Sequence, residues 1–399
     1  MARSGKRACG AERACENAAA MVFDVAVLGG GVIGCAVARA VARGGRRVAL
    51  FERGRIGAES SAAAAGILGV QGETDDEVML RLGLDSRRLY PDLLDAVREE
   101  TGIAVEFWRA GTVCVAFNAA DEAVLETRRA WQEAAGATSE RLAPQQIWTL
   151  EPEISRRARA GMLFPLDGRV DSAALTQALA RAAAAAGCVL REGEEVKAVV
   201  AEGGRVAGIT TASGRVPCDT VVNALGAWAG RVRGTTPLPV QPVRGQIAVV
   251  AAPRPPFRHT VYSPRAYAVA RRDGRVLLGS TRERVGFDKR VTAGGIGSIL
   301  EAALELAPGL GELPLVDAWA GLRPGSGDGR PIVGADPAVH GYFVASGHYR
   351  NGVLLAPLTA QLIDALLRGE RNQWHDVLGL ERFIEPAGPR NVDPPAPDR

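Results

Sequence analysis

One stretch of the sequence has residue types and spacing that suit a nucleotide. Gly29-Gly30-Gly31-Val32-Ile33-Gly34 fits the pattern GxGxxG, and Glu52 follows 18 residues later. In such a turn the glycines let the backbone approach a pyrophosphate at the start of a helix, and the acid can hold both hydroxyls of a ribose. A carboxylate in that place disfavours a 2′-phosphate, so an adenosine of the FAD or NAD type is expected.

A second stretch, Ala345–Leu355, carries a basic residue on a glycine-flanked turn. We expect a strand over Tyr342–Ala345, then a polar loop, then a helix over Gly352–Leu367. The unpaired N–H groups and the dipole at the start of such a helix favour negative charge, and Arg350 lies beside them. From these residues alone, an ordinary strand-to-helix turn is an equally good interpretation.

Two further stretches are rich in small residues. Glu59–Leu68 contains the paired serines Ser60 and Ser61, which can cap a helix or bind phosphate, although a tight helix–helix contact explains the same composition. Ala320–Pro331 holds four glycines around Arg323. An arginine can offer two parallel N–H donors to a carboxylate, while a salt bridge within the loop is the alternative role.

Periodicity predicts the elements that must position these residues. A buried strand over Val22–Leu28 leads into the first glycine turn, a helix follows over Val32–Arg43, and a strand over Arg47–Phe51 ends at Glu52. This order of strand, turn, helix, strand and acid makes a weak motif specific. Further expected elements are the helices Thr74–Thr101 (broken near Gly83 or Pro91), Asp121–Ala135, Ser172–Ala186 and Ile296–Leu306, and the strands Met162–Leu166, Thr220–Leu225, Arg244–Ala252 and Val316–Leu322.

Composition argues against several classes of protein. The 399 residues are 47% apolar with a net charge of +3, and no block of like charge or basic–aromatic stripe indicates nucleic-acid binding. No stretch approaches the ~20 apolar residues needed to cross a bilayer. The six cysteines and four histidines are scattered without CxxC spacing. No metal site is therefore expected, and the thiols suit a reducing, cytoplasmic compartment.

The two ends of the chain are expected to lie outside the fold. Basic residues before an apolar run near Val22–Ala38 superficially resemble a secretory signal, but Asp24 and three glycines interrupt that run. We expect residues 1–20 to be an extended, disordered start, with Met21 as an alternative initiator. Residues 386–399 are rich in proline and are expected to form a mobile tail.

Together these stretches resemble the FAD-dependent amine and amino-acid oxidases of the D-amino-acid oxidase superfamily, most closely the glycine oxidases of thiamine biosynthesis. The resemblance covers Met21 to about Leu380. Its most specific pieces are AGLRPGSGDGRP, at Ala320–Pro331, and GHYRNGVLLAP, within Ser346–Pro357. It implies FAD rather than NAD as the cofactor.

The resemblance implies an α/β fold in which a substrate domain interrupts the cofactor domain. We expect a Rossmann-type, glutathione-reductase-like FAD-binding domain over residues 21–104, 166–240 and 322–385. An antiparallel-sheet α+β substrate domain is expected to be inserted over residues 105–165 and 241–321.

The resemblance also assigns residues to the site. Its substrate contacts, which are also the expected catalytic residues, fall on Tyr267, Arg323 and Arg350. The expected cofactor-binding residues, including the glycines of the turns, are Gly29, Gly31, Val32, Ile33, Gly34, Glu52, Arg53, Ser60, Ser61, Ala65, Gly66, Ile67, Val196, Gly226, His348, Tyr349, Arg350, Asn351, Gly352, Val353 and Leu354. The small-residue stretch after Glu59 is thereby interpreted as a cofactor contact.

The implied activity is oxidative deamination of glycine and other small primary or secondary amino acids, such as sarcosine and D-alanine. The products would be the 2-oxo acid, ammonia or an amine, and H₂O₂, and the imine would feed thiazole synthesis. Hydride would pass from the α-carbon to the flavin and electrons then to O₂, while Arg323 and Tyr267 hold the substrate carboxylate. The alternatives are a D-amino-acid or secondary-amine dehydrogenase with another acceptor and, in a different class, a flavin-binding subunit without turnover.

Two departures from the related sarcosine oxidases matter. Those enzymes place a lysine near the flavin for O₂ activation, and the matching strand here, Arg275–Thr281, has none. They also hold FAD through a cysteine, whereas no cysteine follows Cys218 in this chain. Non-covalent FAD is therefore expected, and the means of O₂ activation and the oligomeric state, including a homo-oligomer, are left open.

Overall fold

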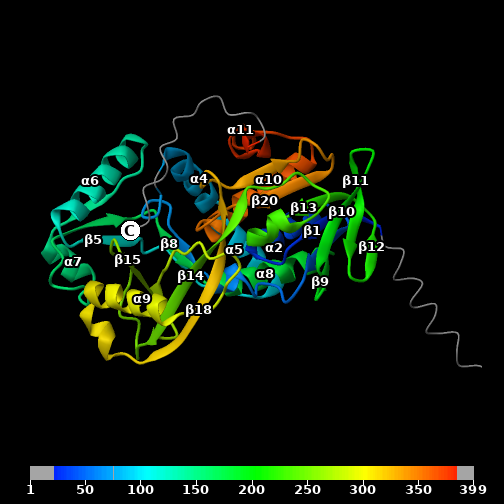
Figure 1. Cartoon of the computed structure of the whole chain (residues 1–399). Coiled ribbons are helices and arrows are strands. Elements are labelled where there is room, and N and C mark those ends of the chain that lie inside the picture. Colours follow the sequence, from blue (N-terminus) through cyan, green and yellow to red (C-terminus); the bar gives the residue numbers. More distant parts are fainter. Residues whose placement is uncertain (1–21, 75, 384–399) are drawn as a thin grey trace, which may run out of the picture.

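The computed structural model describes residues 22–74 and 76–383 (Figure 1). The predictions for residues 1–20, for Met21 and for the tail from residue 386 lie outside this part of the chain.

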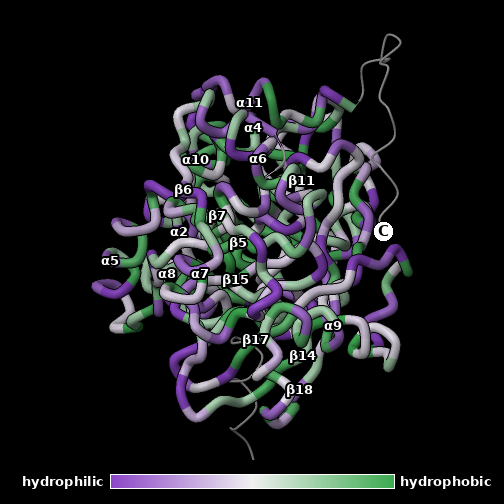
Figure 2. Tube along the Cα trace, turned by 90° about the vertical axis from the view of Figure 1, so that its left-hand side faces the viewer, coloured by the Kyte–Doolittle hydropathy of each residue, from purple (hydrophilic) through white to green (hydrophobic). Residues whose placement is uncertain are grey.

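Figure 2 shows hydrophobic stretches mainly in the interior, near β5 and β15, and hydrophilic ones mainly at the periphery. The described helices are each too short or too polar to span a bilayer. The predicted α/β class is confirmed.

A six-stranded sheet, in the order β19-β20-β13-β1-β2-β9, carries the nucleotide-type motif. β1 (Phe23–Leu28) lies at its centre and pairs in parallel with β2 (Val48–Glu52) and with β13 (Cys218–Asn223). A parallel strand of this kind is covered on both faces, which explains its nearly continuous apolar run. The outer strands are β9 (Val189–Glu192), β20 (Tyr342–Ser346) and β19 (Ile332–Ala335).

Three helices pack together against this sheet. α2 (Val32–Arg43) begins directly after the glycine turn, as predicted, and packs against both α8 (Ser172–Ala185) and α10 (Gly352–Leu367). Asp171 is the N-cap of α8, because its side chain accepts a hydrogen bond from the Ala174 N–H at 2.9 Å. α10 begins at Gly352, the residue that the sequence predicted.

Pro357 lies inside α10, and neighbouring helices compensate for the hydrogen bond that it removes. Proline has no N–H to donate to the Val353 carbonyl, one turn earlier. The hydroxyl of Tyr90, in α5 (Tyr90–Thr101), donates to that carbonyl instead. Ser86, in α4 (Glu77–Arg88), donates to the Leu354 carbonyl at 2.7 Å. The start of α10 is therefore held by residues more than 250 positions earlier.

The predicted helix over Thr74–Thr101 is two helices in the structure. They meet at Leu89, and Pro91 falls in the first turn of α5, where proline is tolerated. The alternative break at Gly83 was wrong. Gly83 lies inside α4, where a Cβ would come within 3.3 Å of the Leu354 side chain. Its small size therefore serves the contact with α10.

An eight-stranded, mostly antiparallel sheet forms the second large layer, in the order β18-β14-β17-β16-β15-β5-β7-β6. α9 (Ala293–Leu306) packs on β14 and β17, and buried aliphatic side chains fill the space between them. The strands are β18 (Leu315–Ser326), β14 (Val240–Ala251), β17 (Arg275–Gly279), β16 (Tyr267–Ala270), β15 (Thr260–Tyr262), β5 (Thr112–Ala116), β7 (Ala160–Phe164) and β6 (Glu140–Leu142). The helices near its far end are α6 (Ala119–Ala134) and α7 (Pro144–Leu150).

The longest strand pair, β14 and β18, reaches from this layer towards the six-stranded sheet (Figure 1). Its register runs from Val240 opposite Ser326 to Val250 opposite Leu315. Arg323 therefore lies on a strand, although its glycine-rich surroundings suggested a loop. An isolated bridge joins Gly325 to His348, which places the end of β18 beside the turn before α10.

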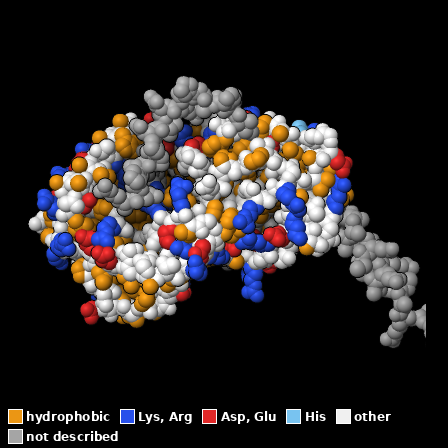
Figure 3. All heavy atoms as spheres, in the orientation of Figure 1, with side chains coloured by type: hydrophobic (Ala, Val, Ile, Leu, Met, Phe, Trp, Pro, Cys, Tyr) orange, Lys and Arg blue, Asp and Glu red, His pale blue; other side chains and the backbone are white. Residues whose placement is uncertain are grey.

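Basic and acidic side chains are interspersed over the face drawn in Figure 3, with no stripe of one sign.

Two three-stranded sheets and several short helices complete the described fold. The small sheets are β3 (Ile67–Leu68), β8 (Gly168–Val170) and β4 (Phe107–Trp108), and β10 (Val196–Glu202), β11 (Arg205–Thr211) and β12 (Gly214–Val216). The short helices are α3 (Ser60–Ala63), α11 (Gln373–Leu378), η1 (Gly226–Arg231), η2 (Pro308–Glu312) and η3 (Leu380–Phe383).

Candidate active site

Two adjoining cavities lie between the two large sheets. The inner cavity has about 1070 Å³ of empty space and is bounded by β18, β16 and the turn before α10. The outer cavity, with about 1220 Å³, lies over the end of β2 and the start of β10. They share the lining residues Gly31, Ser60, Ser61, Ala224 and Gly226, so together they form one elongated channel past the start of α2.

Most of the predicted site residues line this channel. The inner cavity is lined by Gly31, Val32, Ile33, Ser60, Ser61, Ala65, Gly66, Ile67, Gly226, Tyr267, Arg323, His348, Tyr349, Arg350, Gly352 and Val353. The outer cavity is lined by Gly29, Gly31, Glu52, Arg53, Ser60, Ser61, Val196 and Gly226. Three predicted residues line neither cavity: Gly34 and Leu354 are packing residues, and Asn351 is the N-cap of α10.

The glycine turn is built so that backbone, not side chain, faces the channel. Gly29 has a φ of +103°, and a Cβ there would lie 2.5 Å from the Ala224 carbonyl oxygen. A Cβ on Gly34 would lie 1.9 Å from the Gly29 carbonyl oxygen, so this glycine permits α2 to pack on the turn. No acidic side chain lies in the first turn of α2. Its N–H groups and dipole therefore form a site for an anion.

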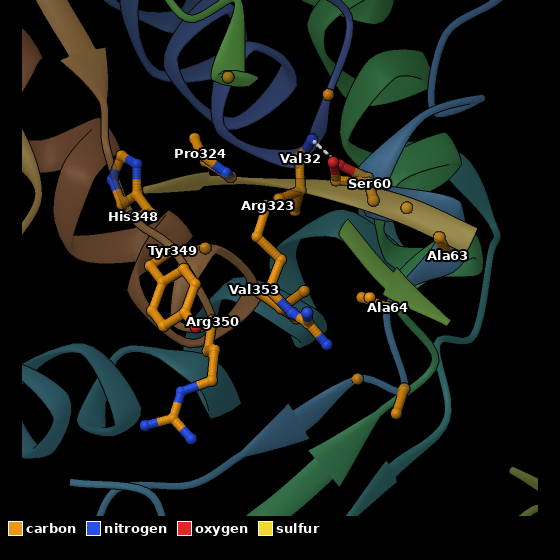
Figure 4. A pocket seen from close by; sticks show the side chains of 18 of the residues that line it. Val32, Ser60, Ala63, Ala64, Arg323, Pro324, His348, Tyr349, Arg350 and Val353 are labelled. Atoms are coloured by element: carbon orange, nitrogen blue, oxygen red, sulfur yellow. Dashed lines mark hydrogen bonds between the residues drawn. The ribbon is translucent and has the colours of Figure 1, made fainter. Parts of the chain in front are cut away.

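Ser61 closes one side of this anion site. Its hydroxyl accepts a hydrogen bond from the Val32 N–H at 2.9 Å; this bond is the dashed line that starts at Val32 in Figure 4. The neighbouring Ser60 hydroxyl donates to the Leu322 carbonyl on β18. The paired serines of α3 thus connect the start of α2 to the second sheet, which the sequence alone left open.

Glu52, at the end of β2, points into the outer cavity. Its two carboxylate oxygens accept from the Gly30 N–H at 2.8 Å and from the Gly54 N–H at 2.9 Å. Each oxygen can accept a second hydrogen bond, which leaves room for two hydroxyls of a ligand. The next residue, Arg53, lies 4.0 Å from the ring centroid of Trp228 and pairs with Glu59 at 2.8 Å.

Arg323 enters the inner cavity from β18. Its guanidinium donates to the Thr281 carbonyl at 3.0 Å and to the Ser280 hydroxyl at 2.7 Å. It lies over Gly245, where a Cβ would be 2.1 Å from its nitrogen. Burial lowers the pKa of the guanidinium, but arginine stays charged in proteins. Two of its five N–H donors hold it in place, and the others suit a carboxylate.

Tyr267 lies on β16, close to Arg323 in the same sheet. The side chain is 8% exposed and covers Gly279, where a Cβ would lie 2.5 Å from its hydroxyl oxygen. Burial raises the pKa of the hydroxyl, with the charge of Arg323 opposing that shift. The hydroxyl is therefore a proton donor at neutral pH. Arginine and tyrosine together can hold one carboxylate.

Arg350 enters the inner cavity from a different element, the turn before α10 (Figure 4). The preceding Tyr349 has a φ of +48°, which is uncommon for a residue with a side chain, and its N–H donates to the Pro324 carbonyl at 2.8 Å. This bond and the Gly325–His348 bridge fasten the turn to β18. The two arginines are therefore brought together by backbone contacts.

His348 does not act on the inner cavity through an ionised ring. Its Nε2 lies 2.9 Å from the Thr359 hydroxyl of α10, and the residue is 2% exposed. Burial lowers the pKa of the ring to about 3, so it is neutral at physiological pH. The side chain of His348 ties the turn to α10, so only the backbone of this residue is suited to face a ligand.

Sequence reasoning missed Glu73, which also lines the inner cavity. Its carboxylate lies 3.9 Å from the Arg350 guanidinium, and its backbone carbonyl accepts from Arg350 at 3.1 Å. Glu73 stands in an irregular segment between β3 and α4. No motif or periodicity marks it, because the contact joins residues 277 positions apart.

A family model described as FAD dependent oxidoreductase matches residues 24–366 of this chain. The chain belongs to this FAD-dependent oxidoreductase family. FAD is therefore its cofactor, and the prediction of FAD rather than NAD is confirmed.

Individual relatives agree with the family. The chain is 38% identical over 350 residues to the glycine oxidase of Geobacillus kaustophilus, and this alignment covers 86% of this chain and 93% of that protein. It is 32% identical over 347 residues to the bifunctional protein ThiO/ThiG of Trichormus variabilis. This alignment covers 52% of that protein, about half of its length. The crystal structure of glycine oxidase from Geobacillus kaustophilus superposes with a TM-score of 0.85 at 36% identity, covering 88% of this chain and 96% of that one.

The channel fits FAD in shape and in chemistry. Its two cavities meet at the start of α2, which suits a dinucleotide whose pyrophosphate lies at the helix N-terminus. The outer cavity ends at the Glu52 carboxylate, a partner for ribose hydroxyls. None of the four described cysteines lines the channel, and burial raises the pKa of Cys114, Cys188 and Cys218 to about 12. The described thiols are thus not placed to bond the cofactor.

Proposed function

We propose that this chain catalyses the oxidative deamination of glycine and other small primary or secondary amino acids, such as sarcosine and D-alanine. The products are the 2-oxo acid, ammonia or an amine, and H₂O₂. The observation that carries the proposal is the pairing of Arg323 with Tyr267 at the inner end of a channel that fits FAD. The 38% identity to a glycine oxidase supports the choice of substrate.

In this proposal the two ends of the channel have different tasks. The outer cavity holds the adenosine of a non-covalently bound FAD, with Glu52 at the ribose and the glycine turn at the pyrophosphate. The inner cavity holds the flavin ring against the turn before α10. When bound, FAD supplies the acceptor for the hydride of the substrate α-carbon.

The residues of the chain orient the substrate and need not move a proton from carbon. Arg323 and Tyr267 bind the carboxylate, which fixes the α-carbon relative to the ring. The N–H groups at the start of α10 stabilise negative charge that develops on the ring. His348 is neutral and bonded to Thr359, so it serves as a structural support of that helix.

We further propose the domain division that the sequence suggested. Residues 21–104, 166–240 and 322–385 form the FAD-binding domain, and 105–165 and 241–321 the substrate domain. The separation of the parallel and antiparallel sheets supports this division, while β18 crosses its boundary at residue 321. A cytoplasmic location, and delivery of the imine to thiazole synthesis, follow from the same proposal. The ThiO/ThiG relative supports the second point.

An anaerobic titration of the purified yellow protein tests the proposed function. Glycine, sarcosine or D-alanine should bleach the flavin absorbance, and air should restore it with formation of H₂O₂. A flavin that stays oxidised with all three would reject the proposal and favour a binding subunit without turnover. Bleaching followed by rapid dye reduction and negligible O₂ uptake would favour a dehydrogenase. The cofactor should also leave the protein on acid precipitation, since a yellow pellet would indicate a covalent bond.

A further inference from the structure

The two groups that accept from the Arg323 guanidinium lie just beyond the end of a strand. The ladder between β14 and β17 ends where Ile247 lies opposite Gly279. Ser280 and Thr281, whose hydroxyl and carbonyl accept from Arg323, come next in the chain and belong to no strand. The ladder of the sheet therefore does not fix these two residues, and other contacts must hold them in place.

The side chain of Glu283 supplies such a contact. One of its carboxylate oxygens accepts from the Thr281 hydroxyl at 2.5 Å and from the Gln246 side chain at 2.7 Å. The Gln246 N–H donates to the same Thr281 hydroxyl at 2.9 Å. Gln246 belongs to β14 and is fully buried. Thr281 is thus tied to the sheet through Glu283 and Gln246 together.

The other carboxylate oxygen of Glu283 is held by a second residue of β14. The buried Arg244 guanidinium donates to it. The backbones of these two residues also exchange hydrogen bonds, at 2.8 and 3.0 Å. Although burial acts to raise it, the hydrogen bonds from three side chains lower the pKa of the Glu283 carboxyl to about 2. Glu283 is therefore ionised at neutral pH and has a fixed place beside Thr281.

A contact on Thr281 is transmitted to Arg323 with little slack. The guanidinium donates to the Thr281 carbonyl at 3.0 Å and lies so close over Gly245 that a Cβ there would be 2.1 Å from its nitrogen. A displaced Thr281 would therefore move the guanidinium relative to the cavity. A misplacement of about 1 Å can cost up to about 100-fold in rate. Glu283 itself lines neither cavity of the channel, so its effect on a ligand must pass through such contacts.

We propose that Glu283 positions Arg323 for the substrate carboxylate, by holding Thr281, whose carbonyl accepts from the guanidinium. Glu283 is a positioning residue, because it touches neither the channel nor Arg323. The inference rests on the proposed function for the location of the substrate. It extends the carboxylate site of Arg323 and Tyr267 to a residue outside the cavity.

Acetate binding tests the inference without turnover. Acetate carries one carboxylate and should perturb the flavin absorbance of the aerobic holoenzyme when it enters the inner cavity. Glu283→Gln keeps the shape, but its amide nitrogen has no acceptor for the hydrogen bonds that one carboxylate oxygen receives. The variant should bind acetate about tenfold more weakly than the wild type. The KM for glycine should rise by a similar factor, kcat should change less, and the flavin content should stay the same.

Asp288 provides a matched control in the same segment. Its carboxylate also pairs with Arg244, at 3.3 Å, and its side chain is 27% exposed, against 25% for Glu283. Its hydrogen bonds come from Arg290 and none comes from Thr281. Asp288→Asn should therefore leave the acetate affinity unchanged, even if both variants lower the free energy of unfolding. An equal loss of acetate affinity in the two variants would overturn the inference, since it would assign the effect to the charge around Arg244.

Two variants of Thr281 test the route from Glu283 to Arg323. Thr281→Ser keeps the hydroxyl and should bind acetate like the wild type. Thr281→Val keeps the shape without the hydroxyl and should weaken acetate binding as Glu283→Gln does. Combining Thr281→Val with Glu283→Gln should add little, because both changes interrupt one contact. Additive losses, or normal acetate affinity in either single variant, would overturn the inference. If Glu283→Gln does not fold, the comparison of the two Thr281 variants decides.

The outcomes also distinguish this inference from the proposed function. If glycine fails to bleach the wild-type flavin, the proposed function is rejected, while acetate affinity still reports on Glu283. If glycine bleaches the flavin and acetate affinity does not respond to Glu283→Gln, the proposed function stands and the inference falls. If acetate does not perturb the wild-type flavin, the inner cavity is no carboxylate site, and the inference falls as well.

Discussion

We expect the replacement of Arg323 to weaken substrate binding and to leave cofactor binding unchanged. Its hydrogen bonds go to Thr281 and Ser280, which follow β17 of the antiparallel sheet, and involve no residue of the glycine turn. A hydrogen bond to a charged group contributes about 1.5–3 kcal/mol. Arg323→Ala should therefore raise the KM for glycine roughly 10- to 150-fold. The flavin content of the desalted variant, measured by visible absorbance, should equal that of the wild type.

A nearby arginine provides the control for this variant. Arg284 is exposed and follows β17 within the same part of the chain. Arg284→Ala should leave both KM and flavin content unchanged, because the side chain lines neither cavity. A normal KM in Arg323→Ala would remove Arg323 from the carboxylate site.

At the scale of elements, the contact between the glycine turn and α2 requires that Gly34 has no side chain. A Cβ there would lie 1.9 Å from the Gly29 carbonyl oxygen, closer than two atoms can approach. Gly34→Ala must therefore shift the helix away from the turn and disturb the anion site between them. We expect this variant to purify with little bound flavin, measured as visible absorbance per mole of protein.

The same substitution in another helix should have the opposite effect. A Cβ on Gly297, within α9, would meet no described atom within 4 Å. Alanine is favoured over glycine inside a helix by roughly 0.5–1 kcal/mol. Gly297→Ala should raise the free energy of unfolding by that amount and keep the wild-type flavin content. Equal flavin content in the two variants would contradict the role assigned to Gly34.

The free energy of unfolding should depend on pH through Asp167, whose carboxyl group holds the loop before α4. Burial raises the pKa of this carboxyl from 3.8 to about 6, although two backbone N–H groups oppose the shift. Since the pKa in the folded state exceeds that in the unfolded state, the folded protein binds more protons between these values. The stability that Asp167 contributes is thus fully present below pH 3.8 and is lost as the pH rises through 6. A shift of this size corresponds to roughly 3 kcal/mol.

Asp167→Asn removes this titration and gives the measurement. The variant loses one acceptor for the Gln71 or Gly72 N–H and should be less stable at every pH. Its stability deficit relative to the wild type should be largest near about pH 4 and should shrink by up to about 3 kcal/mol near about pH 7. Urea unfolding at both pH values tests this, with the exposed Asp92→Asn on α5 as the control. A deficit that does not change with pH would show that Asp167 does not titrate in this range.

The local elements of the cofactor site were the most predictable part of the structure. The glycine turn, α2 and Glu52 follow one another within 30 residues, so spacing and glycine content specify them without knowledge of the rest of the fold. The start of α10 at Gly352 was also predicted correctly, because apolar periodicity follows a glycine-flanked turn. Errors of one or two residues occurred at strand ends, as at β2 and β13, where the sequence carries no strong stop signal.

Contacts between distant segments could not be predicted. The strand position of Arg323 depends on its pairing opposite Val243 of β14, and the glycines around it suggested a loop instead. Glu73 reaches Arg350 only because a network centred on Asp167 holds its segment. Likewise, Ser60 could not be connected to Leu322 from the sequence, since 262 residues separate them. Each of these contacts depends on the tertiary fold, which brings together segments that are far apart in the sequence.

At the scale of the whole molecule, a segment of the eight-stranded layer reaches back over the outer cavity. Phe287, between β17 and α9, lies 5.5 Å from the Trp228 ring, and the Arg231 guanidinium lies 3.8 Å from the Phe287 ring. Lys289 pairs with Glu59 at 2.7 Å. Trp228, Arg231 and Glu59 all line the outer cavity. The antiparallel layer thereby supports the wall at which we place the adenosine of FAD.

Phe287 should therefore contribute to FAD retention even though it does not line the channel. An aromatic pair contributes about 0.5–1.5 kcal/mol and a cation–π contact about 0.5–1 kcal/mol. Phe287→Ala should accordingly weaken FAD binding by about tenfold, measured by fluorescence titration of the apoprotein. Lys289→Gln should change it by less than about fivefold, because the pair is exposed. Val285→Ala, at a side chain 41% exposed in the same segment, should have no effect. Equal FAD affinity in Phe287→Ala and Val285→Ala would mean that the wall of the outer cavity holds its shape without support from the antiparallel layer.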